Sequence, residues 1–137
     1  MDGLIIKPEW LKQIYEPVAP YTEPKTWEIR GNKTSKRGRI YLLESGSGLV
    51  TGETTIIDCV KINDVETWLA NKNKHQVDEV AYGPLKMNGF AYAWSKYNGK
   101  IYAYVLKDTV KYKTPIKYDK PKGAIIWVKN VETIMEH

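Results

Sequence analysis

The sequence predicts an α+β protein built on a small β-barrel of about six strands with peripheral helices. Short segments rich in β-branched and aromatic residues recur along the chain, separated by Gly, Pro and Asn turn signals. Two segments have the spacing of an amphipathic helix. The chain has 137 residues, of which 42% are hydrophobic and 27% charged, so it is long enough to bury a core of its own. We therefore expect residues 1–137 to form a single domain.

The two helical segments have recognisable starts. Pro8 begins the first, because a proline needs no backbone N–H in a first helical turn. Its apolar face consists of Trp10, Leu11, Ile14 and Tyr15. Asn63 is the candidate cap of the second helix, whose apolar face contains Val65, Trp68 and Leu69. Residues 71–88 have no clear period, and a further helix followed by a loop at Gly83-Pro84 is one interpretation.

Strands are predicted at residues 4–7, 26–30, 39–44, 49–62, 90–94, 100–106 and 124–128. The segment 49–62 is either one long strand or a pair of strands bent at Gly52. Asn98-Gly99 is a strong hairpin signal, so we expect residues 90–94 and 100–106 to pair across it. Residues 108–115 are then a connection.

Composition argues against several classes of protein. No uncharged run reaches about 18 residues, so no transmembrane helix is predicted, and the first residues lack the pattern of a secretory signal. One cysteine and two histidines cannot supply an internal disulfide or a Cys/His zinc cluster. We predict no metal, no cofactor and a cytoplasmic location. Cys59 is expected to be a buried inert thiol, His75 to lie at the surface or cap an element, and His137 to be disordered.

The net charge of +5 is unevenly distributed. Six basic residues and one acidic residue lie between residues 25 and 39, and nine lysines and two aspartates lie between residues 96 and 129. Acidic residues dominate the segment between them. If the fold brings the two basic segments together, they form a positive face suited to a partner that carries phosphates. The alternative is that these lysines only keep strand edges soluble.

Residues 25–30 carry an unusual concentration of charge for a strand. Alternation places Thr26, Glu28 and Arg30 on one face and Lys25 on the other. Glu28 and Arg30 can then form an ion pair, to which Lys25 could add a third charge. Such a pair offers an acceptor for the N–H edge of a base and a forked donor for a carbonyl or phosphate oxygen. The alternative is an ion pair that only ties a helix or loop to the barrel.

The same segment resembles the signature of the ASCH domain family (activating signal cointegrator homology). The motif is Lys25-Thr26-Trp27-Glu28-Ile29-Arg30 followed by Arg37-Gly38-Arg39-Ile40. Residues 101–108, Pro115-Ile116, Lys122-Gly123-Ala124 and Trp127 resemble the closing strands of the family. The resemblance extends from about residue 4 to residue 128 and implies a PUA-like fold.

Members of the PUA-like superfamily commonly bind RNA or modified bases in a cleft beside the barrel, and the resemblance implies that the charged strand lines this cleft. Arg37 and Arg39 would then lie near its rim, and Tyr104 and Lys122 would come from the closing strands. The candidate nucleotide-binding residues are Lys25, Thr26, Glu28, Arg30, Arg37, Arg39, Tyr104 and Lys122. The implied partner is RNA, another single-stranded nucleic acid or a modified nucleoside, and no membrane.

The resemblance also leaves a catalytic alternative open. Some relatives are amidohydrolases that remove an acyl group from a modified cytidine with a threonine nucleophile on this strand and a lysine three residues before it. Lys25 matches that lysine, but Glu28 occupies the position of the nucleophile. Other relatives are ribonucleases. In either kind of hydrolase, with or without a metal, Glu28 would act as general base and Lys25 would stabilise developing negative charge. Binding is the preferred interpretation because of the residue at the nucleophile position.

Overall fold

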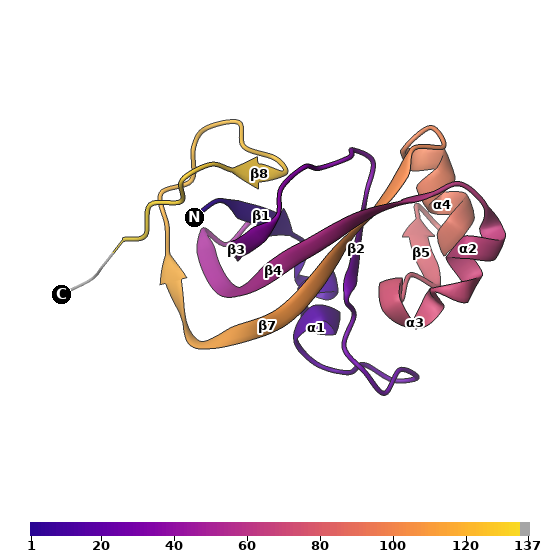
Figure 1. The fold of residues 1–137 in the computed structure, drawn as a ribbon, viewed down its shortest axis with the longest axis horizontal. Coiled ribbons are helices and arrows are strands. Elements are labelled where there is room, and N and C mark those ends of the chain that lie inside the picture. Colours follow the sequence, from indigo (N-terminus) through magenta and orange to yellow (C-terminus); the bar gives the residue numbers. More distant parts are fainter. Residues whose placement is uncertain (135–137) are drawn as a thin grey trace.

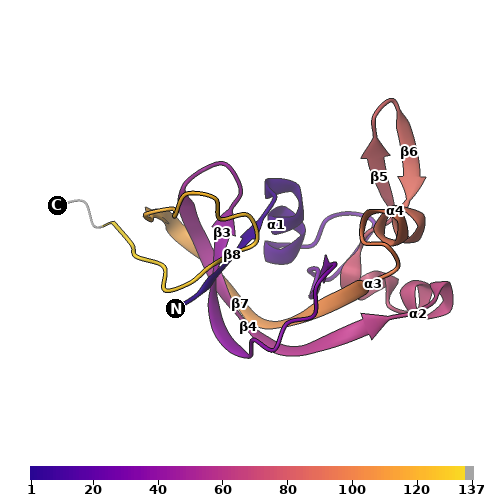
Figure 2. The same ribbon diagram turned by 90° about the horizontal axis from the view of Figure 1, so that it is seen from above.

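The computed structural model describes residues 1–134 and contains a mixed six-stranded sheet that curves into a half-barrel (Figure 1, Figure 2). The strand order is β2 (Trp27–Arg30), β7 (Ile101–Lys117), β4 (Leu49–Ile62), β3 (Gly38–Glu44), β1 (Gly3–Ile6) and β8 (Trp127–Val128). β1 and β3 pair in parallel, and the other neighbours pair antiparallel. The predicted α+β fold on a small barrel is confirmed.

Two long strands form the centre of the sheet. β4 and β7 pair from Leu49 opposite Lys117 to Ile62 opposite Ile101, with shifts in register at three places. Gly52 lies at one of them, and a Cβ there would be 2.3 Å from a backbone oxygen of β7, so a glycine is needed for this close approach. Residues 49–62 are therefore one strand with an irregularity at Gly52. The connection predicted at residues 108–115 is wrong, because β7 continues through it.

Helices cover the sheet in two places. α1 (Pro8–Tyr15) packs Leu11 and Ile14 into the barrel core. α2 (Val65–Ala70), α3 (Lys72–His75) and α4 (Gly89–Lys96) gather at the other end of the long strands (Figure 1), where Trp68 and Ala93 share a second core with Ile101. Asp64, rather than the predicted Asn63, caps α2. No helix within residues 1–134 has the length and apolar character needed to cross a membrane.

Residues 90–94 form part of α4, so the strand predicted there is wrong. Asn88 caps this helix by accepting a hydrogen bond of 2.8 Å from a backbone N–H of the first turn. Asn98 and Gly99 both have positive φ, as a tight hairpin would require, but here they follow the end of the helix. The apolar residues from Phe90 to Tyr97 recur at three and four positions, which is the helical period that the hairpin signal concealed.

A two-stranded hairpin, β5 (Glu79–Tyr82) and β6 (Leu85–Asn88), was not predicted from the sequence. Its turn is Gly83-Pro84, and Gly83 has a φ of +60°. Both strands are only four residues long and mix charged with apolar residues, so no clear alternation marks them. The hairpin stands beside α4 and projects away from the large sheet (Figure 2). α3 accounts for the helix expected earlier in this segment.

His75 is fully buried, so the surface position expected for it is wrong. Its Nδ1 accepts a hydrogen bond from the Val77 N–H at 3.0 Å, and its Nε2 donates to the Trp68 carbonyl at 2.7 Å. Burial lowers the pKa of His75 to about 4, so its ring is neutral near pH 7. Cys59 is half-buried at the edge of the barrel core. The prediction for His137 falls outside the described residues.

Candidate functional site

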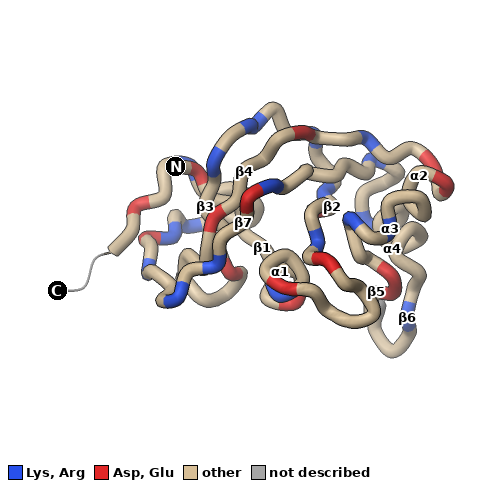
Figure 3. The backbone as a smooth tube through the Cα atoms, turned by 60° about the horizontal axis from the view of Figure 1, so that its bottom comes forward, with Lys and Arg blue, Asp and Glu red and all other residues tan. Residues whose placement is uncertain are grey.

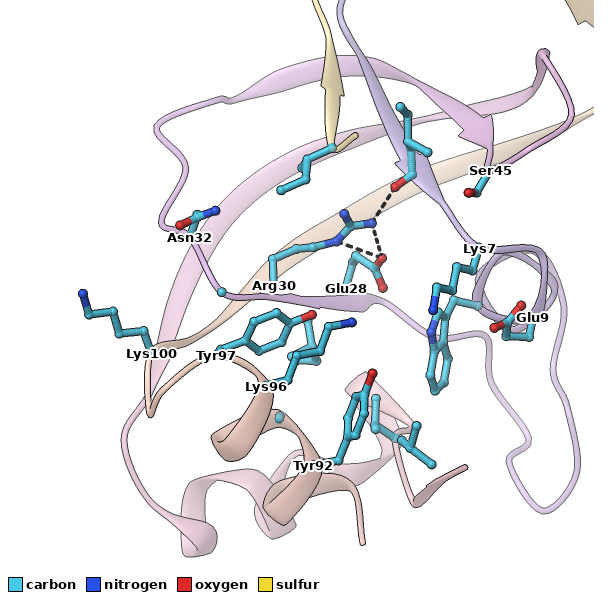
Figure 4. Close-up of a pocket in the computed structure, with 18 of the residues that line it drawn as sticks. Lys7, Glu9, Glu28, Arg30, Asn32, Ser45, Tyr92, Lys96, Tyr97 and Lys100 are labelled. Atoms are coloured by element: carbon cyan, nitrogen blue, oxygen red, sulfur yellow. Dashed lines mark hydrogen bonds and ion pairs between the residues drawn. The ribbon is translucent and has the colours of Figure 1, made fainter. Parts of the chain in front are cut away.

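A cavity of about 610 Å³ lies between α1 and α4, and β2 forms part of its wall (Figure 4). This volume is in the range of ligand and cofactor sites. Three of the predicted site residues line it: Lys25, Glu28 and Arg30. The structure therefore brings the charged centre of the sequence motif to one cavity.

Glu28 and Arg30 form an ion pair in the wall of this cavity. Arg30 Nη2 lies 2.8 Å from Glu28 Oε2, and Arg30 Nε donates to the same oxygen at 3.2 Å. Arg30 Nη2 also donates to the Ile5 carbonyl at 2.7 Å, which ties β2 to β1. Within residues 1–134, Arg30 Nη1 and Glu28 Oε1 make no hydrogen bond. The pair thus has a structural role and still leaves one donor atom and one acceptor atom.

Lys25 extends the pair into a row of three charges. It precedes β2, so the strand alternation that would place it opposite Glu28 does not reach it, and its Nζ lies 3.9 Å from Glu28 Oε1. Lys25 is 2% exposed, donates to the His75 carbonyl and lies 5.1 Å from the centre of the Trp10 ring. Burial lowers the pKa of Lys25 from 10.5 to about 8; Glu28 opposes this shift and Arg30 adds to it. The ammonium is therefore still mostly protonated at neutral pH.

α4 supplies the opposite wall. Figure 4 shows Tyr92 and Lys96 of α4, and Tyr97 directly after the helix, extending toward Glu28 and Arg30. Tyr97 packs so closely on Gly31 that a Cβ there would lie 2.4 Å from its ring. Sequence reasoning missed Tyr92, Lys96 and Trp10 of α1 as site residues. In a helix, positions 92, 96 and 97 share one face, and this spacing is the signal that could have identified them. The strand predicted at residues 90–94 concealed it.

The cavity has an excess of positive charge. Its lining contains five cationic side chains and two carboxylates. The cations are Lys7, Lys25, Arg30, Lys96 and Lys100, and the carboxylates are Glu9 and Glu28. Of the nine lysines between residues 96 and 129, only the first two reach this lining, and the basic positions that follow along β7 lead toward the end of the sheet that carries the termini (Figure 3). The two basic segments therefore meet at the cavity only in part.

The other candidate residues lie outside the cavity lining. Arg37 is exposed and donates to the carbonyls of residues 34 and 36. Arg39 is held by Glu53 at 3.3 Å and by the Asp108 carbonyl at 2.6 Å, so its guanidinium is occupied within the sheet. Lys122 is exposed in the segment before β8.

Thr26 and Tyr104 also have structural positions. Thr26 is exposed, and its backbone bonds to Lys74 and Leu106. Tyr104 is 1% exposed and its hydroxyl donates to the Asn32 carbonyl at 2.6 Å, which anchors the loop after β2. Burial raises the pKa of Tyr104 to about 12. Neither residue lines the cavity.

The site combines hydrogen-bonding charges with aromatic surfaces. Trp10, Tyr92 and Tyr97 offer faces on which a flat ring could stack, and Glu28 and Arg30 offer an acceptor and a donor at the side of such a ring. Within residues 1–134, no three His, Cys, Asp or Glu side chains are grouped so that they could hold a metal ion.

No protein-family model and no curated protein matches this sequence. Solved structures do match it by fold. Two are crystal structures of variants of an ASCH protein from Zymomonas mobilis. The serine-to-alanine variant has a TM-score of 0.51 and 18% identity over 84% of this chain and 70% of that chain. The tyrosine-to-phenylalanine variant has a TM-score of 0.52 and 17% identity over 85% of this chain and 72% of that chain.

Proposed function

Because the chain has an ASCH-like fold, we propose that it is a binding module for RNA or for a modified nucleotide, and that the cavity takes one unstacked base. The observation that carries this proposal is the row formed by buried Lys25, buried Glu28 and partly exposed Arg30, which faces the aromatic side chains of α1 and α4. Proteins recognise single-stranded RNA by stacking splayed bases on aromatic rings and by bonding to the base edges.

The charges of the cavity suit an anionic ligand. Five cations against two carboxylates favour a group that brings negative charge, such as a phosphate. Lys7, Lys96 and Lys100 are exposed, so they can meet a sugar-phosphate backbone without being displaced from a buried partner. Exposed Arg37 and Lys122 are proposed as weaker backbone contacts. Arg39 is left out of this set because its guanidinium is already bound to β4 and β7.

Selectivity for a base would come from Glu28 and Arg30. A carboxylate accepts from an N–H edge, and a guanidinium donates to a carbonyl oxygen, so the pair suits a base that presents a donor beside an acceptor. Arg30 is fixed by its bond to Ile5, and Glu28 is fixed by Arg30, so both groups are held in place before a ligand binds.

One observation supports hydrolysis as a second candidate function. Lys25 has a pKa of about 8 and lies 3.9 Å from a carboxylate, an arrangement suited to moving a proton or stabilising an oxyanion. The substrate would be an acylated nucleoside or RNA, with Glu28 as general base. Thr26 is not part of this scheme, because it does not line the cavity.

The experiment is a titration of the wild type, Glu28→Gln and the control Glu53→Gln with short single-stranded RNA and with a panel of N-acylated nucleosides. Binding and product release are followed in the same samples. Glu53 pairs with Arg39 on the sheet and does not line the cavity. Glu53→Gln therefore removes the same charge as Glu28→Gln at a place outside the cavity. Circular dichroism at the temperature of the titration checks that each variant is folded.

A binding module predicts salt-dependent RNA binding without product, with base preference altered by Glu28→Gln and unchanged by Glu53→Gln. Release of acid or cleaved RNA that is lost in Glu28→Gln would instead establish the hydrolase. Absence of binding and of product with every ligand would refute both functions.

A further inference from the structure

A second cavity of about 430 Å³ adjoins the first on the side of the β5–β6 hairpin. Its described lining residues are Ala81, Gly83, Met87, Tyr92, Ser95 and Lys96. Tyr92 and Lys96 also line the larger cavity. One turn of α4 therefore forms a wall that the two cavities share.

Lys96 stands on this shared wall with its charge available. Its Nζ lies 5.4 Å from the ring centres of both Tyr92 and Tyr97, and the residue is exposed. Within residues 1–134 no carboxylate pairs with it, and its electrostatic partners are the two tyrosines. Among the described side chains that line the second cavity, Lys96 is the only charged one. An anionic group between the two cavities would therefore meet one ammonium whose partners are neutral tyrosine side chains.

The second cavity also offers surfaces for a ring. Tyr92 contributes an aromatic face and Met87 a flexible thioether, and both side chains are half-buried. Lys96 thus lines both cavities, and each cavity has an aromatic side chain. In a single-stranded nucleic acid one phosphate likewise links two nucleosides.

We propose that the ligand is a single-stranded oligonucleotide of at least two nucleotides, with one base in the larger cavity, the linking phosphate at Lys96 and the next nucleoside beside the β5–β6 hairpin. This inference rests on the proposed function and narrows its ligand class, because a free nucleoside would fill only the larger cavity. The hairpin is then a ligand-binding element.

The experiment compares three ligands with the same base by calorimetry: a nucleoside, its 3′-monophosphate and the dinucleoside monophosphate. For the wild type we expect the phosphate to raise the affinity about fivefold and the second nucleoside to raise it about tenfold more. Lys96→Gln should remove most of the phosphate increment. Lys86→Gln is the matched control, since Lys86 is an exposed lysine of the β5–β6 hairpin that lines neither cavity.

Ala81→Trp tests the second cavity, because the larger side chain would occupy it. We expect this variant to lose the increment from the second nucleoside and to keep the increment from the phosphate. Equal affinities of the wild type for the three ligands would overturn the inference and leave the proposed function standing. Equal losses in Lys96→Gln and Lys86→Gln would also overturn it. Failure of all three ligands and of longer RNA to bind would overturn the proposed function together with the inference.

Discussion

Glu28 lies between two cations, with Arg30 Nη2 at 2.8 Å and Lys25 Nζ at 3.9 Å, and its side chain is 5% exposed. In such a place the carboxylate is the counter-charge on which both cations depend. Removing one member of a buried charge cluster is costly because the remaining charges stay desolvated without compensation. Exposed pairs cost little to break because water replaces the partner.

We therefore expect Glu28→Gln to lower the free energy of unfolding by about 3 kcal/mol. Glu53→Gln breaks a pair of 3.3 Å between side chains that are 28% and 29% exposed, and it should cost less than about 1 kcal/mol. Urea denaturation of both variants and the wild type measures the difference. Equal losses would show that the Lys25–Glu28–Arg30 row is not energetically special.

The burial of Lys25 should make the stability of the protein depend on pH. Its pKa is about 8 in the folded protein against an ordinary value of 10.5. Between these values the unfolded chain binds more protons than the folded one, so this group makes the free energy of unfolding rise with pH. Relative to Lys25→Met, the wild type should gain about 2 kcal/mol between about pH 8 and pH 10.

The measurement is a set of urea denaturation curves of the two proteins across this range of pH. It ends below the range in which buried tyrosines such as Tyr104 ionise, since their raised pKa values would lower stability as pH rises further. A difference between the proteins that stays constant with pH would contradict the burial of a charged Lys25.

α4 lines one wall of the cavity, although no sequence motif indicated this role. Tyr92 and Lys96 belong to α4, and Tyr97 follows its last residue. Asn88 caps α4, and Asp64 caps α2 in the same way at 2.7 Å. The two helices differ in the side chains that they supply to the cavity. α4 supplies Tyr92 and Lys96, whereas α2 supplies the buried Trp68. Loss of the cap on α4 should therefore disturb the site more than loss of the cap on α2.

We expect Asn88→Ala and Asp64→Ala each to lower the free energy of unfolding by about 1 kcal/mol. Asn88→Ala should also weaken RNA binding, because fraying of the first turn of α4 moves its side chains away from β2. Thermal denaturation and an RNA titration at constant salt measure the two effects. Equal changes in RNA affinity for both variants would mean that α4 has no particular role in the site.

The sequence was sufficient to predict the class of fold, and three of the residues that it singled out, Lys25, Glu28 and Arg30, line the cavity. The β-branched segments predicted strands of the barrel, and Pro8 predicted the start of α1. The segment around Glu28 and Arg30 indicated a charged wall because so many charges in a short strand need partners. These signals are local, so they can be read without knowing the tertiary structure.

The strand predicted at residues 90–94 is wrong because a local signal is compatible with two structures. Asn98-Gly99 suits a hairpin turn, and it equally suits the end of a helix, because both need positive φ. A strand at residues 90–94 would place Tyr92 and Lys96 in different elements, so the sequence did not indicate that they share one wall of the cavity. Arg39 matched a family motif, yet its neighbours on β4 and β7 occupy it, and such neighbours are known only from the tertiary fold.

The proposed function requires that RNA binds in the cavity between β2 and α4. Backbone amide shifts of isotope-labelled protein, followed by NMR during titration with a short single-stranded RNA, test it most directly. We expect the largest changes in β2, in Gly31 and Asn32, and in α4, with smaller changes in the β5–β6 hairpin. Changes confined to the far half of β7 and to residues 119–123 would show instead that RNA binds the lysines outside the cavity.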